Sequence, residues 1–198
     1  MAEVAITYPS NVLVHECRKR PSTACNVEVG KRMSSYAIVN QADGSSVQLA
    51  KKLSSNGRWK LLVFSGDLYS PGVLDRLLLF AKEFKDWVQP FSKPWKRQCH
   101  LFETVLIHSN ARACANVLNL PEIFEHFEKE LGWDYEKVFA DDPSYDGNSG
   151  EVYDRYGIDK EKGCLIVCRP DQHVGWIGGF EDVKGLEEYF SKFLMRKT

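Results

Sequence analysis

The densest group of chemically capable residues lies in CLIVCRPDQHVGWIGG, residues 164–179. Two thiols, a guanidinium, a carboxylate, an imidazole and an indole follow one another in this stretch. Residues of these types could form a redox or metal site, or a pocket that binds a ligand. They could also be the last hairpin of a sheet, without any reactive group.

The two cysteines of this stretch are spaced for burial rather than for reaction. Cys164 and Cys168 are four residues apart, so on an extended strand they share one face at a separation of about 13 Å. That separation is too long for a disulfide or for two ligands of one metal ion. The spacing therefore predicts a core-facing strand that carries two buried thiols.

The residues that follow have the composition of a turn. Pro170 presets φ, and Asp171 can bond to its own backbone, so the two residues predict a tight turn between apolar runs. Arg169 could pair with Asp171 or with a neighbouring chain, and an indole serves a core or an interface equally well. We therefore treat four residues as interface candidates: Arg169, Asp171, His173 and Trp176.

The other cysteines and histidines show no redox or metal motif. Six cysteines occur without a C-x-x-C pair, which in a reducing compartment favours free thiols. His100 and His108 stand at opposite ends of one apparent strand, and His126 lies on an amphipathic segment. We expect no metal site, and we interpret the acidic group at 141–146 as a solvated turn because its spacing matches no EF-hand loop.

The overall composition argues against several classes of partner. A net charge of −1 and a pI near 6.5 give no electrostatic basis for binding nucleic acid or an anionic membrane. The apolar runs are too short to span a bilayer, and the first residues lack the pattern of a secretory signal, so we expect a cytoplasmic protein. Nucleotide-binding and hydrolase motifs are absent from the sequence, and we expect no cofactor.

The order of strand and helix patterns predicts one domain preceded by an arm. Residues 1–29 lack periodicity and contain prolines and a basic cluster, which indicates an irregular arm that wraps its own domain or a neighbour. Residues 30–198 form the expected domain. Strand-like runs are expected within 36–53, 57–67, 100–109, 133–143 and the closing hairpin, and helices within 70–88, 116–132 after Pro121, 145–159 and 180–197.

Strands that alternate with helices and end in a hairpin and a terminal helix are typical of a thioredoxin-like sandwich, an α/β fold with a mixed sheet flanked by helices. Active members carry a cysteine where the first long strand meets its helix, because the helix N-terminus stabilises a thiolate. This chain has FSGDLYSPGV at that junction, residues 64–73, and no thiol. The sequence therefore predicts the fold without its redox chemistry.

Two longer runs carry a resemblance to a known family. GCLIVCRPDQHVGWIGGFEDVKGLEEYFSKFL, near the end, and GKRMSSYAIVNQADGSSVQLAKKLSSNGRWKLLVFSGD, residues 30–67, are similar to the C-terminal thioredoxin-like domain of the phenol 2-monooxygenase family of FAD-dependent aromatic hydroxylases. The resemblance covers about residues 30–196. In that family the flavin domain holds the cofactor and the substrate, whereas the thioredoxin-like domain lacks redox cysteines and contributes to dimerisation.

The resemblance implies an accessory role. We expect a non-redox module that forms a homodimer or a complex with a FAD-dependent monooxygenase, in aromatic or polyketide metabolism. Because MAEVAITYPS has the form of a natural start, we expect a split protein rather than a fragment. Two alternatives stay open. One is a repurposed enzyme that acts on a small aromatic intermediate with Asp67, His100 or His108 as acid or base. The other is a residual thiol reductase or peroxidase that uses Cys99 or Cys114.

Overall fold

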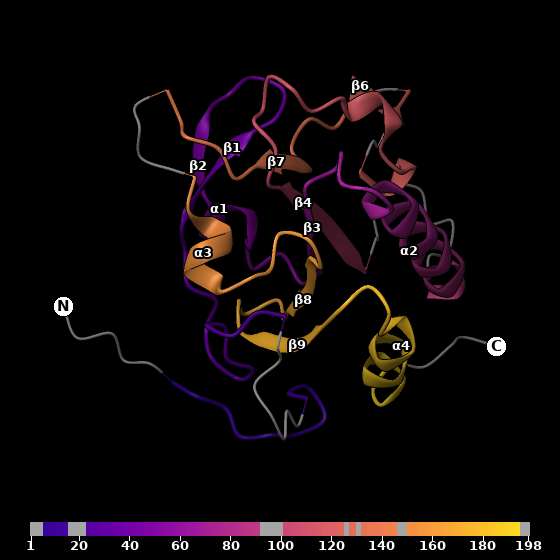
Figure 1. Cartoon of the computed structure of the whole chain (residues 1–198). Helices are drawn as coiled ribbons and strands as arrows, with labels where there is room; N and C mark the ends of the chain where they lie inside the picture. Colours follow the sequence, from indigo (N-terminus) through magenta and orange to yellow (C-terminus); the bar gives the residue numbers. More distant parts are fainter. Residues whose placement is uncertain are drawn as a thin grey trace.

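A seven-stranded sheet in the order β2-β1-β7-β4-β3-β8-β9 forms the centre of the molecule (Figure 1). The computed structural model describes residues 6–15, 23–91, 101–124, 127–129, 132–145 and 150–194. The strands are β1 (Ala37–Asn40), β2 (Ser46–Gln48), β3 (Trp59–Gly66), β4 (Phe102–His108), β7 (Val138–Ala140), β8 (Cys164–Cys168) and β9 (Val174–Gly178). β4 runs parallel to β3 and β7, and the other neighbours are antiparallel, so the expected mixed sheet is confirmed.

Helices cover both faces of this sheet (Figure 1). α2 (Val73–Val88) and α4 (Val183–Ser191) share one apolar core with Leu61, Val63 and Trp176. The short helices α1 (Leu49–Lys52) and α3 (Val152–Tyr156) pack on the opposite face. Because both faces are covered, β3 is buried along its whole length, as its continuous apolar run predicts. Within the described ranges, no helix is long and apolar enough to cross a bilayer.

The expected helix after Pro121 is wrong. The described residues form 3-10 turns at Val117–Asn119 and Glu122–Phe124. They also form a two-stranded antiparallel sheet of β5 (Phe127–Glu128) and β6 (Gly132–Trp133). Elsewhere, a 3-10 turn at Gln89–Phe91 follows α2. The Thr104 hydroxyl on β4 donates to the Ile123 carbonyl at 2.8 Å, so a side chain of the sheet takes the place of an intrahelical donor. Burial of Leu120 and Phe124 meanwhile satisfies the apolar pattern without a helix.

A buried tyrosine joins the two central strands at their carboxyl ends. Tyr153 on α3 is fully buried; its hydroxyl donates to the Ile107 carbonyl at 2.7 Å and accepts from the Gly66 amide at 2.8 Å. The pairing of β3 with β4 shifts register between Phe64 and Gly66, which leaves ladder groups without their usual partners. The hydroxyl supplies both missing partners, and burial raises the pKa of Tyr153, which keeps its proton in place.

Gly66 occupies a position that other residues cannot take. Its φ is 83°, and an added Cβ would run into the carbonyl oxygen of Lys160. That close approach lets the Asp67 amide donate to the same carbonyl at 3.2 Å. The bulge therefore turns the chain sharply out of β3 and towards the start of α2.

Replacement of Tyr153 by Phe should lower the free energy of unfolding by about 2 kcal/mol, because it leaves two buried backbone groups without partners. Urea unfolding followed by circular dichroism measures the change. Tyr156→Phe on the same helix is the matched control, since it removes a single hydrogen bond, to the Ser34 carbonyl at 2.6 Å. A loss for Tyr153→Phe no larger than that of the control would contradict the bridging role.

Candidate functional site

The closing hairpin buries its two thiols as the sequence predicts. Cys164 and Cys168 are fully buried on the face of β8 that packs towards α3, and Leu165 and Val167 face the other core. Burial raises the pKa of each thiol to about 12, so both stay protonated at neutral pH. Nucleophilic or redox chemistry needs the thiolate, and these two cysteines are core residues instead.

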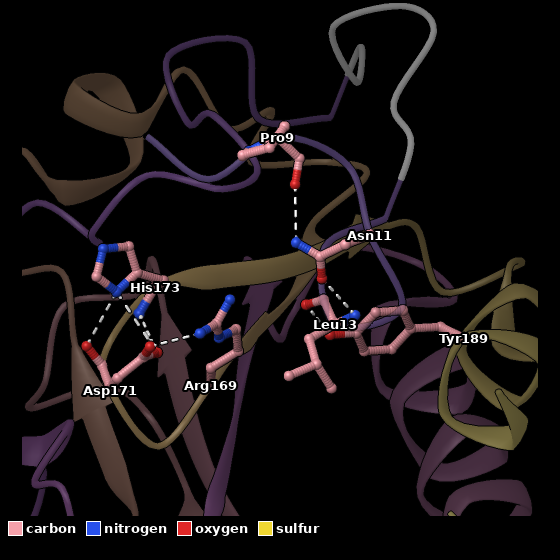
Figure 2. A network of polar contacts seen from close by, with 7 residues as sticks. All are labelled: Pro9, Asn11, Leu13, Arg169, Asp171, His173 and Tyr189. Carbon is pink, nitrogen blue, oxygen red and sulfur yellow. Dashed lines mark hydrogen bonds and ion pairs between the residues drawn. The ribbon is translucent and has the colours of Figure 1, made fainter. Parts of the chain in front are cut away.

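The four interface candidates lie in two different environments. Trp176 on β9 is 1% exposed and belongs to the core with α2 and α4. Arg169, Asp171 and His173 surround the hairpin turn, where the Arg169 guanidinium donates to the Asp171 carboxylate at 2.6 Å (Figure 2). The side chains of Arg169 and His173 are each 13% exposed, and that of Asp171 is 42% exposed.

We call the described residues 6–15 and 23–33 the N-terminal segment, and part of this segment covers the turn. Tyr8 packs against two of the candidates: the guanidinium of Arg169 stacks on its ring at 4.8 Å, and the His173 ring meets it edge-on at 4.8 Å. Arg32 donates from Nε and Nη2 to the Gln172 side-chain oxygen at 3.0 and 2.6 Å. The turn is thus held by residues more than a hundred positions away in the sequence.

Backbone pairing extends this contact along β9. Gly30 donates to Val174 at 2.8 Å, Val174 donates to Lys31 at 2.8 Å, and Met33 donates to Gln172 at 2.9 Å. Farther along the strand, the His15 amide donates to the Gly175 carbonyl at 2.8 Å. This edge of the sheet is therefore paired in cis, which removes an open template for another strand.

The terminal helix anchors the same segment. The Tyr189 hydroxyl on α4 donates to the Leu13 carbonyl at 2.7 Å (Figure 2). Gly175 makes the approach possible, because an added Cβ would run into the Tyr189 hydroxyl oxygen. Val14 is buried beside this contact. Within the predicted irregular arm, the described residues 6–15 are therefore held against the closing hairpin and the terminal helix by defined contacts.

A second polar group lies at the carboxyl edge of the parallel strands, where the alternative acid and base residues fall. Asp67 follows β3 and accepts hydrogen bonds from the Tyr69 amide at 2.9 Å and from the Asn110 side chain, and these bonds hold its pKa below the ordinary value. The Asn110 side-chain oxygen accepts from the Leu68 amide at 2.8 Å. Asp67 therefore shapes the turn that enters α2, at the place of the missing thiol.

His108 ends the neighbouring strand β4 and is fully buried. Its Nε2 lies 3.0 Å from the Gln41 side-chain oxygen; the Gln41 amide nitrogen donates to the Arg112 and Ala115 carbonyls, which fixes that oxygen as the acceptor. The neutral ring therefore donates from Nε2, and Nδ1 has no hydrogen-bond partner among the described residues. Burial lowers the pKa of His108 to about 4.

Of the remaining predicted residues, Asp141 needs a correction, and several others lie outside the described ranges. Asp141 is not a solvated carboxylate: it is 8% exposed, accepts from the Val152 and Tyr153 amides at 2.8 and 3.1 Å, and has a pKa raised by burial. Cys25 and Cys114 are exposed free thiols. Within the described ranges, no group of three or more His, Cys, Asp or Glu is placed to hold a metal ion. Three residues named above, Cys99, His100 and His126, lie outside those ranges, as do Cys17 and Asp146.

His108 should make stability fall as the solution becomes acidic. Above pH 6.5 the ring is neutral in both states; below it the unfolded chain binds a proton that the folded chain resists down to about pH 4. The group alone should remove about 3 kcal/mol of the free energy of unfolding over that range. Urea unfolding at several pH values should show a shallower loss for His108→Gln than for the unsubstituted protein. Parallel curves for the two proteins would contradict this assignment.

Comparisons with known proteins show the family to which the chain belongs. A family model described as "Phenol hydroxylase, C-terminal dimerisation domain" matches residues 6–198. Phenol 2-monooxygenase fsqG of Aspergillus fumigatus is 33% identical over 192 residues, which cover 94% of this chain and 31% of the relative. The FAD-dependent monooxygenase terD of Aspergillus terreus is 28% identical, with 99% of this chain and 33% of the relative covered. The chain thus spans about a third of the length of these curated relatives.

The solved structures support the fold. A thiol:disulfide interchange protein DsbE from Chlorobium tepidum superposes with a TM-score of 0.52 at 13% identity, over 83% of this chain and 96% of that one. At this identity the likeness concerns the fold alone, which is thioredoxin-like. On the match of the family model over nearly its whole length, the chain belongs to the phenol hydroxylase C-terminal dimerisation domain family.

Proposed function

We propose that the chain is a non-redox dimerisation and accessory module that works with a flavin-dependent aromatic hydroxylase in the cytoplasm, in aromatic or polyketide metabolism. The observation that carries the proposal is the family match over residues 6–198, on a fold whose reactive junction holds no thiol. The module then acts through the surfaces that it offers to another protein.

The chemistry of the junction supports a structural role. Asp67 stands where an active relative of the fold would hold its thiolate, and its carboxylate is engaged with the Tyr69 amide and the Asn110 side chain. Those bonds shape the loop before α2 and leave no thiol–disulfide exchange at this place. The two cysteines of β8 are committed to the core.

The relatives support an association with flavin chemistry. The relatives are a phenol 2-monooxygenase and FAD-dependent monooxygenases, and the matched region covers 27% to 33% of the length of each. In our proposal the flavin and the substrate belong to such a partner, and this chain supplies contacts that assemble it. A homodimer of the module would bring two partners together.

The alternative is an enzyme that acts on a small aromatic intermediate without flavin. One observation favours it. Asp67 follows β3 and His108 ends β4, and these two strands are parallel neighbours whose carboxyl ends form the edge where α/β folds commonly place their sites. In this alternative the two residues serve as acid and base. His100, the third candidate, lies outside the described ranges.

Sedimentation equilibrium of the purified chain should show a reversible dimer, with a dissociation constant of about 10 µM or tighter, as is common for interfaces of standard size. Addition of FAD should leave the chain colourless after gel filtration, because the proposal assigns the flavin to the partner. A species that stays monomeric up to about 100 µM, a concentration tenfold above that constant, would contradict the dimerisation role.

The alternative has its own measurement. Incubation of the chain with small aromatic intermediates, without flavin, should give no turnover above the uncatalysed rate. Turnover that falls at least about a hundredfold in Asp67→Asn would instead establish an enzyme, since loss of a general acid or base typically costs that much. Asp43→Asn is the control, because Asp43 is a turn carboxylate on another loop, bonded to the Ser45 amide at 2.8 Å.

A further inference from the structure

An exposed stretch without charge lies on the N-terminal segment. Residues 6–14, ITYPSNVLV, contain no Asp, Glu, Lys, Arg or His, in a protein of which 27% of the residues are charged. Every residue from 6 to 13 is exposed, and Ile6 and Val12 are 56% and 54% exposed. We call the large apolar residues of this stretch the apolar ridge: Ile6, Tyr8, Val12 and Leu13.

The apolar ridge is held in one conformation by its own backbone. Asn11 and Val14 exchange two backbone hydrogen bonds at 3.0 and 3.1 Å, which closes a turn around Val12 and Leu13. The Asn11 side chain donates to the Pro9 carbonyl at 2.9 Å and accepts from the Leu13 amide at 2.8 Å (Figure 2). Burial of Val14 fixes the end of the turn to the domain.

The closing hairpin positions the other end of the apolar ridge. The Tyr8 ring rests between Arg169 and His173, and its amide donates to the Gly30 carbonyl at 2.9 Å. Tyr189 holds the Leu13 carbonyl from the terminal helix. A surface that is ordered before binding loses little conformational entropy when a partner arrives. Large apolar side chains are enriched at the centres of interfaces, which is the place that we assign to these residues.

The absence of charge favours a second copy of this chain as the partner. In a two-fold dimer each residue near the axis faces itself or a close neighbour, so a charged residue there would meet a like charge. Residues 6–14 bring no such conflict, and depletion of charge is typical of interface centres. At the border, Arg169 and Asp171 supply both signs, which a copy can match in antiparallel fashion.

Three other exposed apolar residues, Leu78, Leu79 and Leu118, lie in less suitable settings. Leu78 and Leu79 on α2 are 42% and 59% exposed, but they share the outer surface of the helix with Asp75, Lys82 and Glu83. Leu118 is 81% exposed on a 3-10 turn of three residues. Scattered apolar residues of this kind are ordinary on a protein surface.

We infer that the apolar ridge is the centre of the surface through which two copies of this chain associate, with Arg169 and His173 as residues that position it. This inference rests on the proposed dimerisation function and adds the surface that performs it. The ridge forms the apolar centre, and the hairpin turn with its ion pair forms part of the polar rim.

The test compares two double variants by sedimentation equilibrium. Ile6→Ser with Val12→Ser should raise the dimer dissociation constant at least about tenfold, since exposed anchors at an interface centre each contribute on the order of 1 kcal/mol or more. Leu79→Ser with Leu118→Ser removes comparable exposed apolar side chains elsewhere and should change the constant less than about threefold, which is within 0.7 kcal/mol. Thermal unfolding checks that each variant is folded.

A charge substitution tests the two-fold arrangement itself. Val12→Arg places like charges close to the axis, so it should abolish the dimer at low salt and recover part of it as salt screens the repulsion. Two results would contradict the assignment of the apolar ridge while leaving self-association in place. One is a dimer that neither Val12→Arg nor the Ile6→Ser, Val12→Ser double variant weakens. The other is an equal loss of affinity in the Leu79→Ser, Leu118→Ser control. A monomeric unsubstituted protein would remove the dimerisation function, and the ridge with it.

Discussion

The hydroxyl of Tyr153 is the constraint on which the arrangement of the sheet depends. It pairs the Gly66 amide with the Ile107 carbonyl at the point where β3 and β4 lose their common register. Without a partner of this kind, a bulge between two central strands would bury unsatisfied backbone groups. Because the Tyr153 hydroxyl supplies that partner, the chain can turn at Gly66, approach the Lys160 carbonyl closely and place Asp67 just before α2. One side chain from a five-residue helix therefore sets the geometry of the edge where this fold usually performs chemistry.

The same edge explains how a redox fold can lose its reaction and keep its shape. At the place where an active member of the fold carries its thiol, Asp67 accepts hydrogen bonds from the Tyr69 amide and the Asn110 side chain and so supports the loop directly. His108 is committed in a similar way, because Gln41 fixes its ring between two loops. Cys164 and Cys168 are buried in the core, where burial keeps their thiols protonated and they pack as small apolar side chains.

The confirmed sequence predictions rest on two kinds of pattern, apolar runs and turn-forming residues. Continuous apolar runs located β3, β4 and β8, and Pro170 with Asp171 located the turn after β8, because strand period and turn chemistry are local properties. The predictions that are wrong needed information from distant residues. Residues 116–132 have a helical apolar pattern after Pro121, yet the Thr104 hydroxyl donates to the Ile123 carbonyl and Glu122–Phe124 forms a 3-10 turn. Asp141 has the sequence context of a surface turn, yet α3 folds over it and its carboxylate caps the first amides of that helix. No local signal in the sequence points to Tyr153, although a tyrosine among buried residues of a short helix is the residue type that a buried bridge needs.

The N-terminal segment shows most clearly why periodicity fails as a guide to order. It has neither helical nor strand period, and its order comes from partners such as Gln172, Gly175 and Tyr189, all in the last thirty residues of the chain. Two glycines, Gly30 and Gly175, leave room for the backbone contacts that a side chain would block. Ordering the segment costs conformational entropy, which backbone pairing along β9 and burial of Val14 offset. The outward side chains of the segment contribute little to that balance. Ile6 and Val12 are 56% and 54% exposed on this ordered backbone, so the contacts that hold the segment also present the apolar side chains that we assign to the surface for a second copy.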